Sequence, residues 1–409
     1  MQNKKKKIKK RKIPMGTMNI GPYAKKLIRK TLDKNRLSYG EFSQKFESQF
    51  AKLHNVKYAI YTVSGTCALQ MAVHVLKRIH KWRDGDEVIV PSITFIATSN
   101  IVLHNNLRPV FVDVLPDTYN IDPSKIEEKI TKKTRAIIPV HMYGLPADMD
   151  EIFQIAKKYK LKIIEDACES VTAKYKNRPV GSIGDLGCFS TYVVHVITTG
   201  VGGIVTTNNP EYAIKVRSLM NHGRDSIYLT IDDDNNLTKK TNKEAFKMVD
   251  RRFSFVDVGY SYRLTEMEAA LGLEQLKNIQ KIIQKRQFNA NYLIKGLGEL
   301  SNFIQLPTIP KDRTHVFLGF PIVIKDRRIS RDKLIMFLEK NGIETRYMMP
   351  LLNQPIYKEI FGKDIEDYYP VAKHINNNGF YIGCFPELTK EDLDYVIYTF
   401  KKALKVAAV

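Results

Sequence analysis

Cysteine, tryptophan and long apolar runs are scarce in this chain of 409 residues. The four cysteines stand far apart and form no Cys-x-x-Cys pair, whereas iron–sulfur clusters and cysteine-only zinc sites normally use closely spaced cysteines. We therefore expect no metal site and a reducing compartment. No apolar run approaches the roughly 20 residues that a membrane helix needs, and no apolar segment follows the charged N-terminus. We expect a cytoplasmic protein with no membrane partner.

Charge is unevenly distributed. The formal net charge is +22, and residues 4–12 hold eight basic residues in nine. A run of this kind is usually a solvated tail, and the alternative is an electrostatic arm for nucleic acid or an anionic surface. It carries no aromatic residues that could stack on bases. We therefore predict a disordered basic tail over residues 1–14 and no nucleic-acid partner.

Short apolar segments alternate with helical patterns between residues 56 and 208. Before them, Phe42, Phe46 and Phe50 recur at four-residue spacing, which predicts the packed face of a helix. Apolar, β-branched segments separated by helices indicate a parallel sheet covered on both faces. Ligands of such sheets bind outside the carboxyl ends of the strands. The predicted strands are 56–63, 87–91, 108–114, 134–144, 161–167, 188–194 and 202–208, with helices at 64–79, 92–105 and 148–160.

In the second half of the chain the regular alternation of strand and helix patterns ends. Residues 226–255 are polar, and we predict a loop there that closes over the site. A long helical pattern over 264–297 leads into strand and helix patterns of a different order. We predict an α/β fold with a large domain over residues 15–300 and a smaller α+β domain over residues 301–409.

Polar residues follow several of the predicted strands. Ser64, Gly65 and Thr66 open a helix, whose N–H groups and dipole can hold a phosphate, although such residues also simply cap helices. Asp166 ends an apolar strand and can pair with a protonated heterocycle nitrogen, as pyridoxal phosphate requires, or cap a helix. Ser190 also follows a strand. The run TTGVGG (198–203) is neither GxGxxG nor a P-loop, and no GxSxG elbow surrounds Ser190.

In order and spacing these segments resemble the DegT/DnrJ/EryC1/StrS family, fold-type-I enzymes that use pyridoxal phosphate and act on nucleotide-linked keto sugars. The resemblance runs from about Met15 to the C-terminus. It is carried by SGTCALQMAV (64–73), VPSITFIATSNIV (90–102), IIEDACESVTAKYKNRPVGSIGDLGCFS (163–190) and GYSYRLTEMEAALGLEQL (259–276). It implies a large cofactor-binding α/β domain with a mainly parallel sheet between helices, followed by a smaller C-terminal α+β domain.

The resemblance also implies roles for individual residues. Gly65 and Thr66 would bind the cofactor phosphate, with Ser190 as a third contact. Phe95 would stack on the pyridine ring, and Asp166 would pair with the ring nitrogen.

Two further positions depart from the family's usual residues. Glu169 falls where the family usually has glutamine near the ring's O3′ hydroxyl. The GYSYR segment matches a loop that reaches the phosphate of the neighbouring subunit, which implies a homodimer with shared active sites. Ser261 replaces a common asparagine there, and Arg263 can take over its contact.

His195 stands five residues after Ser190, where most members of the family have the lysine that holds the cofactor covalently. An imidazole is not a primary amine and cannot form that bond. The pyridoxal or pyridoxamine phosphate must then be held without a covalent link, and His195 can still move a proton near neutral pH. Tyr192-x-x-His195 resembles the nucleotide-sugar 3-dehydratase branch of the family, in its cluster-free form because grouped cysteines are missing. The segment YMMPLLNQP (347–355) departs from that branch.

The resemblance thus implies a 3-dehydratase that acts on a nucleotide-linked 4-keto-6-deoxy sugar, uses an amino donor such as glutamate, and has His195 and Asp166 as catalytic residues. One alternative is a nucleotide-sugar aminotransferase of the same family. Another is a non-catalytic relative that binds a sugar nucleotide, although a dead site need not retain Asp166, Ser190, Gly65 and Thr66 together.

Overall fold

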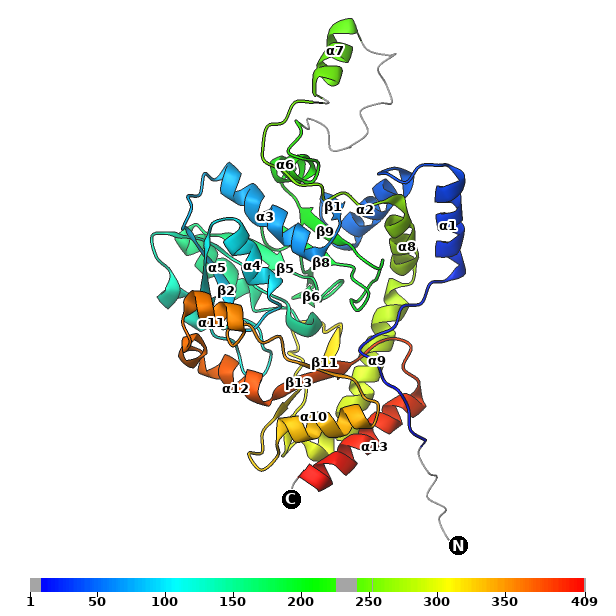
Figure 1. The fold of residues 1–409 in the computed structure, drawn as a ribbon, viewed down its shortest axis with the longest axis vertical. Helices are drawn as coiled ribbons and strands as arrows, with labels where there is room; N and C mark the ends of the chain where they lie inside the picture. Colours follow the sequence, from blue (N-terminus) through cyan, green and yellow to red (C-terminus); the bar gives the residue numbers. More distant parts are fainter. Residues whose placement is uncertain (1–8, 226–240, 252, 408–409) are drawn as a thin grey trace.

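A seven-stranded sheet forms the centre of the protein in a computed structural model, which describes residues 9–225, 241–251 and 253–407 (Figure 1). Strand β9 runs antiparallel to both of its neighbours, and the other neighbouring pairs are parallel, so the mainly parallel sheet is confirmed. Across the sheet the strands are β1 (Tyr58–Thr62), β9 (Gly203–Thr207), β8 (Leu186–Ser190), β5 (Lys162–Asp166), β4 (Thr134–Ile137), β2 (Glu87–Pro91) and β3 (Arg108–Val112).

Helices cover both faces of this sheet because alternate strand residues point to opposite sides. In β2, Val88 and Val90 pack in one cluster with helices α3 (Gly65–Ile79) and α4 (Ala97–His104), whereas Ile89 packs in another cluster with α5 (Met149–Tyr159). The helices that follow these strands are α3, α4, α5 and α6 (Pro210–Met220). The short strands β6 (Lys174–Tyr175) and β7 (Arg178–Pro179) pair with each other.

The phenylalanine stripe lies on α2 (Glu41–Leu53), which follows α1 (Pro22–Asp33). Phe42, Phe46 and Phe50 are all buried in one cluster, as predicted. The helical pattern over 264–297 forms two helices, α8 (Glu266–Lys277) and α9 (Ile279–Leu297). They separate at Asn278, whose backbone leaves the helical region and whose side-chain amide donates to the Glu274 carbonyl. The predicted helical stretch is thus present and is interrupted at this residue.

A second, antiparallel sheet lies beyond the first (Figure 1). It is packed against α9, α10 (Arg331–Lys340) and α13 (Lys390–Ala407), whose apolar residues share one cluster with its strands. Its strands are β10 (Ile304–Gln305), β11 (Gly319–Ile324), β13 (Gly379–Gly383) and β12 (Thr345–Tyr347), and α11 (Pro355–Phe361) and α12 (Pro370–Asn378) complete this part. We keep the proposed domain boundary at residue 300, although α9 contributes to the core of the second part.

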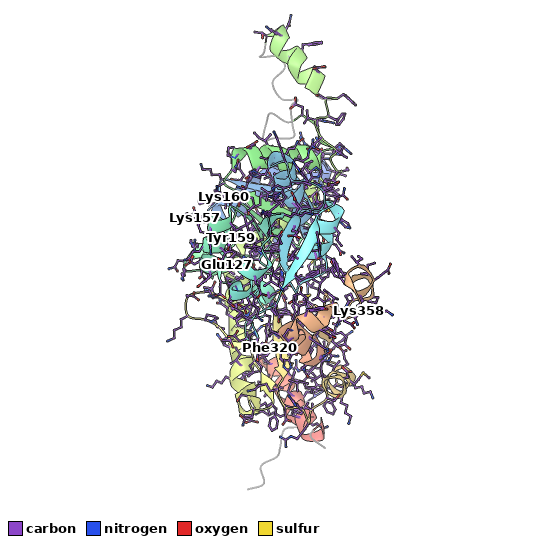
Figure 2. All side chains as sticks on the ribbon, turned by 90° about the vertical axis from the view of Figure 1, so that its left-hand side faces the viewer. Glu127, Lys157, Tyr159, Lys160, Phe320 and Lys358 are labelled. Atoms are coloured by element: carbon purple, nitrogen blue, oxygen red, sulfur yellow. The ribbon has the colours of Figure 1, made fainter. Side chains whose placement is uncertain are left out.

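Figure 2 gives the view at right angles, in which Lys157, Tyr159 and Lys160 project from one side and Lys358 from the other. Phe320 of β11 lies in the lower part of that view, where its side chain is completely buried. No helix of the described residues combines the length and the apolar character needed to cross a membrane.

Residues 9–14 do not form the disordered tail that we predicted. Ile13 is buried, and its backbone exchanges hydrogen bonds with Gly342 and Glu344. Arg11 forms an ion pair with Asp392 at 2.6 Å. The basic pattern concealed these specific partners, which lie more than 300 residues away; residues 1–8 fall outside the described part of the chain.

The segment 226–255 was predicted as a loop that closes over the site. Residues 226–240 lie outside the described residues, and α7 (Asn242–Arg251) is a helix, so that part of the prediction was wrong. In Figure 1 α7 lies past α6, at the end of the molecule away from the second sheet. The helix predicted from residue 92 begins at Ala97, because Ile93 pairs instead with Pro350 in a β-bridge.

Candidate active site

A pocket of about 640 Å³ opens at the carboxyl ends of β1, β2, β5 and β8. These four strands point the same way, so the segments that follow them meet at one edge of the sheet. The structure brings together seven of the eight residues that we singled out for catalysis or cofactor binding: Gly65, Thr66, Phe95, Asp166, Glu169, Ser190 and His195.

The N-terminus of α3 forms one end of the pocket. Ser64 caps the helix by accepting a hydrogen bond from the Cys67 N–H at 3.1 Å, which leaves the preceding N–H groups of Gly65 and Thr66 to other acceptors. Gly65 lies so close to β8 that a Cβ atom there would be 2.8 Å from Ser190 Cβ and 2.8 Å from Cys168 Sγ. Only glycine allows the helix end to approach the strand this closely.

Asp166 ends β5 and is buried below the pocket. Its Oδ2 accepts a hydrogen bond from the Thr98 hydroxyl at 2.7 Å, and Oδ1 accepts from the Cys168 N–H at 3.2 Å. Burial nevertheless raises the pKa of this carboxyl group. None of the ion pairs among the described residues involves Asp166, so the carboxylate has no cationic partner of its own in the pocket wall.

Glu169 lies one turn further along the same loop and is also buried. One of its oxygens accepts a hydrogen bond from the Tyr143 N–H, and burial raises the pKa of the carboxyl to about 8. Glu169 therefore carries a proton at neutral pH and can donate a hydrogen bond, which an ordinary glutamate cannot do. Phe95 is 58% exposed and lines the same pocket, where its ring is accessible to a ligand.

His195 lies on the loop between β8 and β9 and contacts the segment that follows β5. Its Nδ1 is 2.7 Å from the Cys168 carbonyl oxygen, which can only accept, so Nδ1 carries the hydrogen and Nε2 holds the lone pair. Burial lowers the pKa of His195 to about 4, and the imidazole is therefore neutral at pH 7. His195 lines the pocket, so its unprotonated Nε2 can act as a base there.

A group of hydroxyls anchors the ends of this loop. Thr191 and Thr199 are hydrogen-bonded to each other at 2.6 Å, and the Tyr61 hydroxyl donates to Thr199 at 2.8 Å. Gly202 has a φ of +146°, and a Cβ there would lie 2.2 Å from the Thr191 hydroxyl. The TTGVGG run thus supports the loop that carries His195, a role that the sequence pattern alone did not indicate.

The second part of the chain supplies the rim of the pocket. Leu318, Arg346, Met349 and Tyr381 line it, and Met15 of the N-terminal segment lies beside them in the pocket wall. Sequence reasoning missed all five, because their positions follow from the packing of distant segments. Of the five, Met349 lies in the segment YMMPLLNQP (347–355), which departs from the dehydratase branch and therefore gave no positive signal.

Arg263 is the one predicted site residue that the structure does not bring into the pocket of its own chain. It is exposed, and its guanidinium lies 3.3 Å from His222 Nε2 and 3.3 Å from Ser261 Oγ. Its expected contact is with a neighbouring subunit, so this prediction stays open. Among the described residues, no three histidine, cysteine, aspartate or glutamate side chains are grouped closely enough to hold a metal ion.

The sheet topology and the position of the pocket are those of an α/β enzyme that binds its ligands at the carboxyl ends of parallel strands. The chain belongs to the DegT/DnrJ/EryC1/StrS aminotransferase family, whose model matches residues 19–401. This confirms the resemblance seen in the sequence.

Relatives of both reaction types are similar to this chain. A GDP-perosamine synthase of Caulobacter vibrioides is 34% identical, over 90% of this chain and 91% of that protein. A dTDP-4-dehydro-2,6-dideoxy-D-glucose 3-dehydratase of Saccharopolyspora spinosa is 33% identical, over 88% and 80%. Among solved structures, the Escherichia coli GDP-4-keto-6-deoxy-D-mannose-3-dehydratase with bound hydrated PLP has a TM-score of 0.83 and 28% identity, over 95% of this chain and 99% of that one.

Proposed function

We propose that this protein is a 3-dehydratase that acts on a nucleotide-linked 4-keto-6-deoxy sugar, gives a 3-deoxy keto sugar, and uses pyridoxal or pyridoxamine phosphate without a covalent link to the protein. The observation that carries the proposal is His195, a neutral imidazole where most of the family has lysine. None of the described residues that line the pocket is a lysine. A transaminase of this family would need such an amine within reach.

The residues of the pocket fit the cofactor. The buried Asp166 carboxylate has no cation beside it among the described residues, and a protonated pyridine nitrogen would supply one. The end of α3 offers N–H groups to a phosphate, and the approach that Gly65 permits brings Ser190 to the same place. Phe95 presents an aromatic face, and the protonated Glu169 can donate to a phenolic oxygen.

When bound, the cofactor supplies an electron sink conjugated with the sugar carbon. The protein's own groups do the rest. Asp166 stabilises positive charge at the ring nitrogen, and Nε2 of His195 takes up a proton and returns it during loss of the C3 hydroxyl as water. Tyr192, Val194 and Val201 add apolar side chains to the pocket that His195 lines.

The test is to incubate the purified protein with pyridoxal phosphate, glutamate and a panel of nucleotide-linked 4-keto-6-deoxy sugars. We expect a keto sugar that has lost one oxygen atom, with one ammonia released per turnover, and no product with His195→Asn. Asp166→Ala should abolish turnover as well. A product that keeps the C3 hydroxyl and carries an amine in place of the ketone would overturn the proposal.

The second candidate is a nucleotide-sugar aminotransferase. The observation that favours it is the 34% identity to a GDP-perosamine synthase. The same incubation decides between the two, because an amine and a 3-deoxy ketone differ in mass and in the release of ammonia.

A further inference from the structure

We propose that Arg286 is a positioning residue for His195: its guanidinium ties the His195 backbone carbonyl to the second sheet, so that the imidazole stays against Cys168 with Nε2 open to the pocket. This inference rests on the proposed role of His195 as the base. Arg286 itself does not line the pocket and acts only through the loop.

Arg286 lies on α9 and is 4% exposed. Its Nη1 donates to the carbonyls of Phe317 at 3.0 Å, Leu318 at 3.2 Å and Cys384 at 2.5 Å. Its Nη2 donates to the His195 carbonyl at 3.3 Å. One side chain thus joins the loop after β8 to the segments that precede β11 and follow β13.

Arg286 is a buried arginine without a paired carboxylate in the described part of the chain, which is unusual. None of the ion pairs among the described residues involves Arg286, and its side-chain hydrogen bonds go to backbone carbonyls. Burial of a cation without a carboxylate is costly, and it persists here because the planar guanidinium matches several acceptors at once. Arg217 offers the contrast, since it is equally buried but bound through both of its terminal nitrogens to Glu47.

The unneutralised charge has a second effect on the loop. A cation next to His195 disfavours protonation of the imidazole, so it acts in the same direction as burial and lowers the pKa of His195. The Cys168 carbonyl acts in the opposite direction. Other titratable groups that share the pocket with His195 are Asp166, Cys168, Glu169, Tyr192, Arg346 and Tyr381. Burial lowers the pKa of Arg286, whereas Cys384 and Glu387 act on it electrostatically and raise that pKa.

The experiment follows the imidazole itself. The full-length protein is prepared with ¹³C-labelled histidine rings, and the His195 signals are assigned by their loss in His195→Asn. The Cε1 shift between pH 4.5 and 8 reports protonation, and the Cδ2 shift reports which ring nitrogen carries the hydrogen. In the wild-type protein, the His195 imidazole should stay neutral, with its hydrogen on Nδ1, over most of this pH range.

Two substitutions separate charge from geometry. Arg286→Gln removes the cation and should raise the His195 midpoint by about one pH unit and mix the two tautomers. Arg286→Lys keeps the positive charge but loses the planar set of guanidinium N–H donors. The His195 titration midpoint should therefore stay low, while kcat should fall at least about tenfold, by analogy with the loss of one charge-assisted hydrogen bond. KM for the sugar should change by less than about twofold because Arg286 does not touch the pocket.

Arg217→Lys is the matched control, since it replaces a buried arginine that makes no contact with the loop, and it should leave the His195 signals and kcat as in wild type. The proposal is overturned if Arg286→Gln leaves both the midpoint and the tautomer unchanged, or if Arg286→Lys keeps the wild-type kcat. If Arg286→Gln fails to fold, the kcat of Arg286→Lys decides alone. An aminated product with the expected histidine signals would refute the proposed function but not the positioning role.

Discussion

Gly65→Ala tests how strictly the end of α3 must approach β8. The added Cβ would lie 2.8 Å from both Ser190 Cβ and Cys168 Sγ, closer than carbon and sulfur atoms can pack, and it would be 3.4 Å from the Phe189 carbonyl oxygen. Ser190 belongs to a buried strand, so the helix end must move by several tenths of an ångström. Overpacking of this kind costs about 1–3 kcal/mol. Alanine suits a helix better than glycine does, so any loss of stability comes from the contact itself.

We expect Gly65→Ala to lower the free energy of unfolding by that amount. If the displacement of the α3 N-terminus weakens the contacts that would hold the phosphate by a similar free energy, pyridoxal phosphate binds about 10- to 100-fold more weakly, since 1.4 kcal/mol corresponds to a factor of ten in Kd. Urea unfolding of the protein and an absorbance titration with pyridoxal phosphate measure the two effects. Gly298→Ala is the control, because Gly298 has helical backbone angles and no atom within 4 Å of its added Cβ. Wild-type stability together with wild-type affinity in Gly65→Ala would refute the reasoning.

Three other predictions follow from the pocket and the core. His195→Lys should allow borohydride to fix pyridoxal phosphate to residue 195 and should suppress dehydration; a peptide map without that adduct would contradict the placement of residue 195. Arg263→Ala and Asp166→Ala should each be inactive alone, yet co-expression should recover part of the activity if two subunits share each site, and sedimentation should show a dimer. Burial lowers the pKa of His54 to about 4 against roughly 6.5 in an unfolded chain, so the native state binds fewer protons between these values and stability falls as the pH falls. In that window His54→Asn should reduce the slope of the unfolding free energy against pH by up to about 1.4 kcal/mol per pH unit, and an unchanged slope would show that His54 does not titrate this way.

Residues that follow strands were predictable because local pattern determines where a strand ends. Asp166 and Ser190 end apolar strands, and the chain direction then places both at the same edge of the sheet. The partners of these residues were not predictable in the same way. Thr98 reaches Asp166 from helix α4, and the Cys168 carbonyl that orients His195 is a backbone group that no side-chain pattern marks. In the sequence, Arg286 looks like one more basic residue of a surface helix. Only the packing of α9 between two parts of the chain brings four carbonyl groups to its guanidinium.

The contacts of residues 11–17 determine when the N-terminal segment can fold during synthesis. Arg11 pairs with Asp392, 381 positions later, and Thr17 donates to Glu387, 370 positions later. At about 5–20 residues per second, a ribosome needs roughly 20–80 s to synthesise that interval. Through this time the earliest part of the chain lacks the surface on which it rests, and Met15 cannot take its place in the pocket wall. The site can therefore be completed only after α13 has left the ribosome, and cofactor capture belongs to the time after that step.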